Sequence, residues 1–253
     1  MLNTQFRMPS QIADIISDEF YGGRYLSGEN KMHVDSLLPT LSKFPFVIID
    51  TSAEKNRHES KSQGETGCRN ELEAKIAAAV VREAMSKRSR FSSDKKHKHE
   101  EIGVISAYKL QVKLLRKELR EMFGDDAVMN AAAIDGMVAS LDSFQGQERE
   151  LIIYSFTKSS KISPQKQRIG FLKELRRLNV AMTRPTKTLV MIGDMDFLSS
   201  CRADNSDTDS YDTSERHFSA FISDMLSKVS NESHPLGEII SCEEFKKRLG
   251  ELP

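Results

Sequence analysis

Residues 138–156 read VASLDSFQGQERELIIYSF, in which two short apolar runs stand on either side of a polar turn. Continuous apolar runs of this length are typical of strands that are buried on both faces of a parallel sheet. The turn carries Gln145, Gly146 and Glu148. A glycine there lets the backbone approach a ligand closely, and the polar neighbours supply groups that can bind one. The stretch therefore predicts two strands that are joined by a turn with a functional role.

The rest of the chain repeats this kind of strand. The predicted strands are FPFVIIDT (44–51), IGVISA (102–107), MVASL (137–141), LIIYSF (151–156) and TLVMIGD (188–194). Helical spacing fills the intervals 9–21, 70–88 and 108–123, whereas 124–136 shows no clear pattern and is expected to be a connector. Strands that alternate with helices predict an α/β fold, a doubly wound parallel sheet with helices on both faces. Ligands of such sheets bind beyond the carboxyl ends of the strands, where we expect the polar turns to lie.

A second informative stretch is GFLKELRRLNVAMTR (170–184), which predicts a helix. Its leucines fall on one face, while Arg177 and Arg184 fall on the other. A surface helix could carry these arginines for solubility alone. Next to the turn 142–148, the pair favours a site for a polyanion. Pro185 disfavours helical backbone before it, so we expect the helix to end at Arg184.

Composition bounds the rest. The chain has 253 residues, 38% hydrophobic and 29% charged, with 37 basic and 37 acidic side chains that cancel. A nucleic-acid partner would therefore need a local patch. Three scattered cysteines predict reduced thiols in a cytoplasmic or nuclear protein, and we expect no membrane span or signal peptide. His97 and His99 lack a third ligand nearby, so no metal site is expected.

The predicted organisation has three parts. Residues 1–200 are expected to form one domain, and 201–214, CRADNSDTDSYDTS, a disordered linker, because that segment is rich in serine and aspartate. Residues 215–253 contain two helical patterns and are expected to form a helical tail.

Four blocks carry a family resemblance. They are QFRMP (5–9), IGVISAYKLQ (102–111), LDSFQGQE (141–148) and RRLNVAMTR (176–184). In this order they resemble the late motifs of superfamily-one helicases, closest to the nonsense-mediated-decay and senataxin-like (DNA2/NAM7-type) subgroup. The resemblance implies a RecA-like domain of the P-loop NTPase type, and it covers residues 1 to about 194.

The resemblance also implies nucleotide contacts. Arg7 and Arg184 match the arginines that reach the γ-phosphate of ATP, and a planar, permanently charged guanidinium suits that task. Phe6 matches an aromatic residue that stacks on adenine, although a core role is nearly as plausible. The residues Gln145, Gly146, Glu148 and Arg177 are implied to lie near the nucleotide. For Glu148 a solvated acid is an equal alternative, and for Arg177 an ion pair with Glu148 or Asp142 is the stronger one.

For nucleic acid, the resemblance implies backbone contacts from residues at strand ends. They are Ser106, Tyr108, Ser140, Ser143 and Lys158. Each serine taken alone is better explained as a helix cap or an exposed hydroxyl.

No GxxxxGK[ST] sequence is present, so the chain resembles the second of two RecA-like domains, with ATP and Mg²⁺ held mainly by a first one. Alone it is expected not to hydrolyse ATP. The implied partners are single-stranded RNA or DNA and that first domain, in cis or in trans. The alternative is a catalytically inactive, truncated paralogue that binds nucleic acid or protein. A nucleotide-dependent oxidoreductase or kinase is disfavoured, because no glycine-rich phosphate loop follows a strand.

Overall fold

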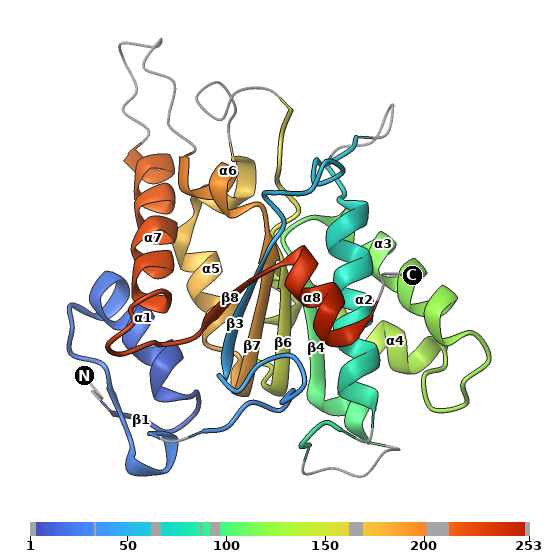
Figure 1. Cartoon of the computed structure of the whole chain (residues 1–253), viewed down its shortest axis with the longest axis horizontal. Helices are drawn as coiled ribbons and strands as arrows, with labels where there is room; N and C mark the ends of the chain where they lie inside the picture. Colours follow the sequence, from blue (N-terminus) through green and yellow to red (C-terminus); the bar gives the residue numbers. More distant parts are fainter. Residues whose placement is uncertain are drawn as a thin grey trace.

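The run LIIYSF forms most of a central strand in a six-stranded parallel sheet (Figure 1). The computed structural model describes residues 4–32, 34–61, 67–86, 88–91, 97–161, 169–200 and 213–250. In sheet order the strands are β5 (Val138–Ser140), β4 (Ile102–Ser106), β6 (Arg149–Ser155), β7 (Pro185–Gly193), β3 (Phe46–Asp50) and β8 (Glu238–Ser241). Every neighbouring pair runs parallel.

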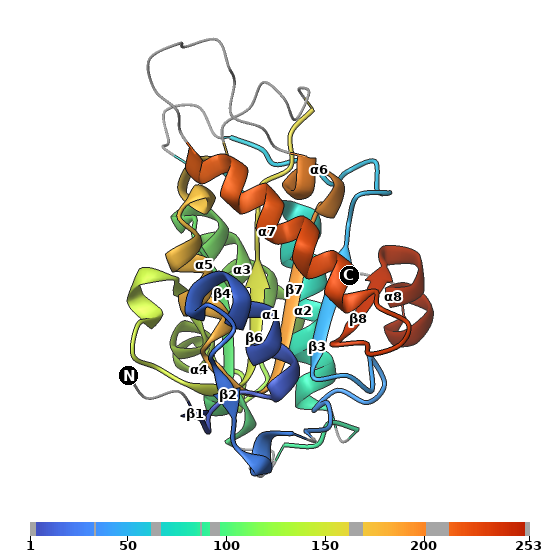
Figure 2. The same cartoon turned by 90° about the vertical axis from the view of Figure 1, so that its left-hand side faces the viewer.

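Helices cover both faces of this sheet. They are α1 (Ser10–Tyr21), α2 (Glu71–Met85), α3 (Lys109–Phe123), α4 (Ala131–Met137), α5 (Leu175–Met182), α6 (Met195–Ser200), α7 (Thr213–Val229) and α8 (Cys242–Leu249). Figure 1 shows α2, α3 and α4 on one side of the sheet and α1, α5 and α7 on the other. Seen from that second side, α1 and α7 lie in front of the strands (Figure 2).

The strands are apolar throughout because both of their faces are buried. In β6, Ile153 packs into the core under α2 and α3, and its neighbour Ile152 packs into the core under α1 and α5. Successive strand residues point to opposite faces, so a strand that is covered twice has no polar face. This confirms the predicted doubly wound α/β fold.

Short elements connect the layers. Two-residue strands β1 (Thr4–Gln5) and β2 (Leu26–Ser27) pair in parallel beside α1. The 3₁₀ turns are η1 (Glu29–Lys31), η2 (Lys98–Glu101), η3 (Asp142–Phe144) and η5 (Gly170–Lys173).

The structure corrects the sequence reading at three elements. The expected connector 124–136 contains α4, whose first turn is capped by the Asn130 side chain. The expected helix 170–184 is divided into η5 and α5, and α5 ends at Met182 instead of Arg184, because Pro185 already belongs to β7. Arg184 therefore lies between a helix and a strand.

The third correction concerns the expected helical tail. Besides α7 and α8, it contributes β8, which pairs with β3 and adds an edge strand to the main sheet. The short run EII of this strand lacks the length that a sequence pattern needs to be recognised. Of the expected linker 201–214, residues 201–212 lie outside the described part of the chain.

Candidate functional site

The turn after β1 is organised by the side chain of Gln5, which is buried. Its Oε1 accepts hydrogen bonds from the backbone N–H groups of Arg7, at 2.8 Å, and Met8, at 2.9 Å. Its Nε2 donates to the carbonyl of Met8 and to the Ser27 hydroxyl, both at 2.8 Å. One amide thus closes the turn and ties it to β2. Sequence reasoning missed Gln5, although its place in the QFRMP block was a signal.

Phe6, the next residue, points outward with 65% of its surface exposed. Its ring lies against Gly28, where an added Cβ would come within 2.3 Å of two ring carbons. Any larger residue at position 28 would therefore displace the Phe6 ring from this contact. The alternative of Phe6 as a core residue is therefore wrong for this structure, and one ring face remains available for stacking.

Arg7, Glu148 and Arg184 come together in space although they are far apart in sequence. Arg7 Nη2 lies 2.5 Å from Glu148 Oε1, and both side chains are about two-fifths exposed, at 41% and 42%. Arg184 is half-buried, and its Nε donates to the Val180 carbonyl at 2.9 Å. Burial lowers the pKa of Arg184, and the positive charge of Arg7 lowers it further. Arg7, its partner Glu148 and Arg184 therefore influence one another electrostatically, and these three residues are here called the arginine cluster.

The arginine cluster lies at the opposite edge of the sheet from the one expected. Glu148 and Arg184 immediately precede the first residues of β6 and β7, and those first residues, Arg149 and Pro185, pair in register. The cluster is therefore at the amino ends of the strands. The rule that ligands of parallel sheets bind at the carboxyl ends of the strands therefore does not describe the arginine cluster.

Two tyrosines and a lysine surround this cluster. Tyr21 and Tyr25 stack with ring centroids 4.2 Å apart. Burial raises the pKa of Tyr25, while the charges of Arg7 and Arg184 lower it. Lys31 donates to the Thr186 carbonyl at 3.1 Å, and burial lowers its pKa, with the nearby Glu148 carboxylate opposing that shift. Lys31 is a second residue near the site that the sequence did not indicate.

The turn 142–148 holds the remaining nucleotide candidates. Gln145 and Gly146 are both exposed. Gly146 has φ of 85°, a left-handed conformation that glycine adopts without strain. Arg177 is not part of the arginine cluster. Its guanidinium pairs with Asp142 and lies over the Phe171 ring, 5.6 Å from the centroid. This is the structural alternative that the sequence left open for Arg177.

The strand-end residues divide into exposed and buried ones. Ser140 and Ser143 are at the surface, with their hydroxyl oxygens 2.8 Å apart. Ser106 is fully buried, and its hydroxyl shares a hydrogen bond with that of Thr157 at 2.9 Å. Tyr108 is also buried and donates to the Ile169 carbonyl at 3.1 Å.

Lys158 is likewise held by a partner within the protein. Its Nζ lies 2.7 Å from Glu59 Oε1, and both side chains are almost fully buried. The expected direct contacts of Ser106, Tyr108 and Lys158 with nucleic acid are therefore not supported by this geometry. The expectation followed strand-end position, which does not reveal whether later loops cover a side chain.

Other functional groups add little to the site. In the described part of the chain, no cluster of three or more His, Cys, Asp or Glu side chains is placed to hold a metal ion. None of the helices described there combines the length and apolar character that crossing a bilayer requires. Cys68 and Cys242 are free, and burial raises the pKa of each to about 12.

Comparison with known proteins agrees with the fold. Residues 1–196 match the model of a family described as an AAA domain. The chain belongs to this family of superfamily-one helicase domains. It is 32% identical, over 79% of its length, to the DNA polymerase alpha-associated DNA helicase A of Saccharomyces cerevisiae. It is 31% identical, over 76% of its length, both to Helicase SEN1 and to the ATP-dependent helicase NAM7 of the same yeast.

The family match supports the nonsense-mediated-decay and senataxin-type subgroup and a RecA-like motor fold. It covers only part of each relative, namely 28% of the polymerase-associated helicase, 8% of SEN1 and 18% of NAM7. The comparison thus identifies this chain as a helicase-family domain, and it does not extend to the activity of the longer relatives.

Proposed function

We propose that this chain is the second motor domain of an ATP-dependent RNA or DNA helicase. A first RecA-like domain, in cis or in trans, binds ATP with Mg²⁺. This chain then places Arg7 and Arg184 against the triphosphate. The observation that carries the proposal is the arginine cluster, where Arg7 pairs with Glu148 and Arg184 lies near both at one edge of the sheet. A nuclear or cytoplasmic location goes with this proposal.

The cluster suits a polyphosphate for an electrostatic reason. The arginine cluster holds two guanidinium groups and one carboxylate, so it keeps an excess positive charge at a partly exposed surface. In phosphoryl transfer, charge spreads over the oxygens of the γ-phosphate, and a positioned arginine offsets it. When phosphate oxygens replace the Glu148 carboxylate at Arg7, the carboxylate becomes free to accept hydrogen bonds from ribose hydroxyls.

The neighbouring groups extend this site. Phe6 would stack on the adenine base, since stacking requires only an open ring face. Gln145 and Gly146 lie in the exposed turn that leads to Glu148, where backbone and amide groups can reach a bound nucleotide. Closure of the two domains on ATP and their opening after product release would produce stepping along a strand.

Single-stranded nucleic acid would bind at the opposite, carboxyl edge of the sheet. Ser140 and Ser143 offer exposed hydroxyls there. Ser106, Tyr108 and Lys158 would act beneath them by fixing the strand ends. Contacts to the backbone do not read bases, so the binding is expected to be independent of sequence.

The test is ATP hydrolysis by the chain mixed with a separately produced first RecA-like domain, in the presence of single-stranded RNA or DNA. Arg7→Ala and Arg184→Ala should each lower kcat by roughly 10³-fold, because an arginine finger contributes that much or more. Arg184→Lys should not restore turnover, since an ammonium cannot form the planar fork.

Arg176→Ala is the matched control, because Arg176 is an exposed arginine on α5, the helix that precedes Arg184 in the chain. It should keep full turnover. If both cluster variants hydrolyse ATP as fast as the unmodified chain, the arginine role is wrong. If the mixture binds nucleic acid but never turns over ATP, the chain is instead the inactive binding module, which the absence of a phosphate loop in this sequence also allows.

A further inference from the structure

A network of six fully buried polar side chains lies at the carboxyl ends of β4 and β6. Its members are Asn70, Glu73, Ser106, Gln111, Ser155 and Thr157. They come from the start of α2, the first turns of α3 and the ends of two strands. Buried polar groups are costly unless hydrogen-bonded, and these bond to one another. The family blocks and the arginine cluster account for none of Asn70, Glu73 or Thr157.

Glu73 is the centre of this network. Its Oε2 accepts from the Ser155 hydroxyl at 2.6 Å and from the backbone N–H of Thr157 at 2.8 Å. Its Oε1 accepts from Asn70 Nδ2 at 3.1 Å. Asn70 in turn caps α2 by accepting from the Glu73 N–H. A single carboxyl group thus joins the start of a helix to the end of the central strand β6.

Thr157 has an unusual backbone conformation. Its φ is 71°, and it is the one non-glycine residue with positive φ in the described part of the chain. For a β-branched residue this conformation costs roughly 1–3 kcal/mol, so surrounding contacts must hold it. The N–H that points to Glu73 belongs to this residue. Residues with strained backbone cluster at functional sites, so Thr157 marks this end of the sheet as a candidate for one.

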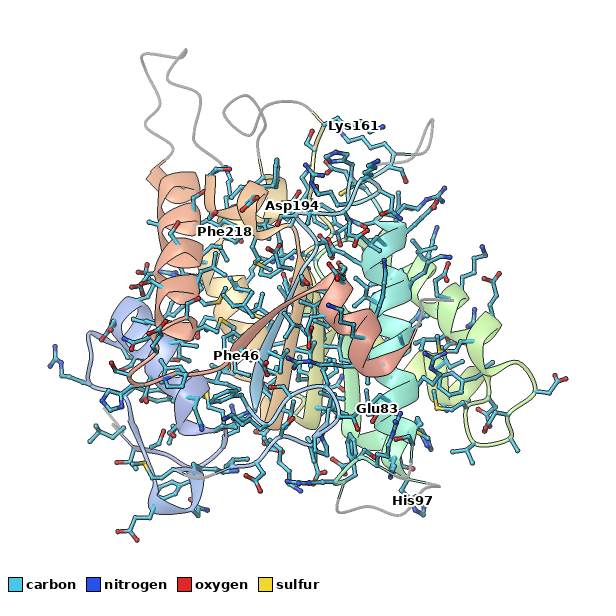
Figure 3. All side chains as sticks on the ribbon, viewed as in Figure 1. Phe46, Glu83, His97, Lys161, Asp194 and Phe218 are labelled. Atoms are coloured by element: carbon cyan, nitrogen blue, oxygen red, sulfur yellow. The ribbon has the colours of Figure 1, made fainter. Side chains whose placement is uncertain are left out.

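The conformation of Thr157 sets the direction of the next two residues, Lys158 and Ser159, both of which have buried acidic partners. Lys158 pairs with Glu59, and the Ser159 N–H donates to the same carboxyl group at 2.6 Å. The Ser159 hydroxyl donates to Asp194 Oδ2 at 2.6 Å. In Figure 3, Asp194 and Lys161 lie toward one end of the strands, and Glu83 and His97 lie toward the other. The path 157–159 is therefore buried beneath the carboxyl edge of the sheet and sets its shape without being exposed itself.

We propose that Glu73 is a positioning residue for nucleic-acid binding, which it promotes by holding Thr157 in the left-handed conformation that sets the chain path 157–159. This inference rests on the proposed function, because it assumes that single-stranded nucleic acid binds at this edge. Glu73 itself is buried and touches no ligand.

The test compares Glu73→Gln with two changes at Thr157. The glutamine places an N–H₂ group against Asn70 or Thr157 and breaks one contact of the network. Amide hydrogen exchange at residues 157–159 should become about tenfold faster, as expected for the loss of a hydrogen bond to a buried carboxyl group. The affinity for a fluorescein-labelled oligo(U) or oligo(dT) strand should fall by a similar factor.

Relief of strain should rescue this loss. Glycine adopts positive φ freely, so Thr157→Gly in the Glu73→Gln background should recover most of the affinity. Thr157→Val keeps the strain and removes only the hydroxyl, and it should not recover affinity. Glu83→Gln is the matched control, because Glu83 is also buried on α2 but lies at its far end beside Arg88.

The outcomes separate the two proposals. If Glu73→Gln leaves exchange at 157–159 and strand affinity unchanged, or if glycine and valine at position 157 act alike, the positioning role is refuted. If the unmodified chain binds no strand while exchange still responds to Glu73→Gln, nucleic-acid binding at this edge fails, and with it the role of Glu73 in binding. If Glu73→Gln does not fold, Ser155→Ala, which removes one donor to the carboxyl group, replaces it and must show the same rescue.

Discussion

At the scale of single residues, Glu73 shows how burial makes a side chain sensitive to pH. Burial raises the pKa of Glu73 from its ordinary value of 4.5 to about 8, while the hydrogen bonds from Ser155 and Thr157 oppose that shift. Folding therefore takes up a proton between these two pH values. The contribution of this group to stability is complete below pH 4.5 and is lost as the pH rises through about 8.

This linkage predicts a specific pH dependence. The difference in free energy of unfolding between the unmodified chain and Glu73→Gln should fall steadily as pH rises from about 4.5 to about 8, by up to about 4 kcal/mol. Urea unfolding at several pH values measures it, and other carboxyl groups cancel in the difference. A difference that stays constant or grows with pH would contradict the raised pKa.

At the scale of elements, the turn between β1 and α1 depends on one side chain. Gln5→Leu removes all four of its hydrogen bonds and leaves the buried N–H of Met8 without a partner. We expect a loss of about 1–3 kcal/mol in the free energy of unfolding. We also expect lower kcat in the reconstituted ATPase, because Arg7 loses its position.

Gln11→Leu, on the partly exposed face of α1, is the control for this change. Urea unfolding gives the stability, and steady-state kinetics at saturating ATP give kcat. If Gln5→Leu and Gln11→Leu have equal effects on both quantities, the buried amide does not organise the turn.

At the scale of the whole molecule, residues 213–250 complete the fold. Phe218, Phe221 and Ile222 of α7 are buried in the core under α1 and α5, and Phe245 of α8 is buried in the other core. Phe245→Ala should therefore destabilise the entire domain by about 3–5 kcal/mol, the usual cost of truncating a buried phenylalanine. Unfolding in urea should remain a single transition.

Lys247→Ala, which changes an exposed residue of the same helix, should cost well under 1 kcal/mol. A small effect of Phe245→Ala, or a separate early transition, would mean that β8 and α8 form an independent appendage. The location of the buried side chains instead indicates one cooperative unit.

The sequence alone determined the fold class, because a strand that is buried on both faces must be apolar throughout and a helix must repeat its apolar residues every three or four positions. It also supplied Arg7, Glu148 and Arg184, through motif blocks that need no coordinates to be recognised. It could not find α4 or β8, since short elements have too few residues for a periodic signal.

Only the tertiary structure decided which residues meet. It brought Arg7 to Glu148 across more than half of the chain and paired Arg177 with Asp142. It also buried Ser106 against Thr157 and Lys158 against Glu59. It also showed that Glu73, an ordinary helix residue in the sequence, holds the end of the central strand. Burial and partnership depend on how distant segments pack, and no local pattern of residues records that packing.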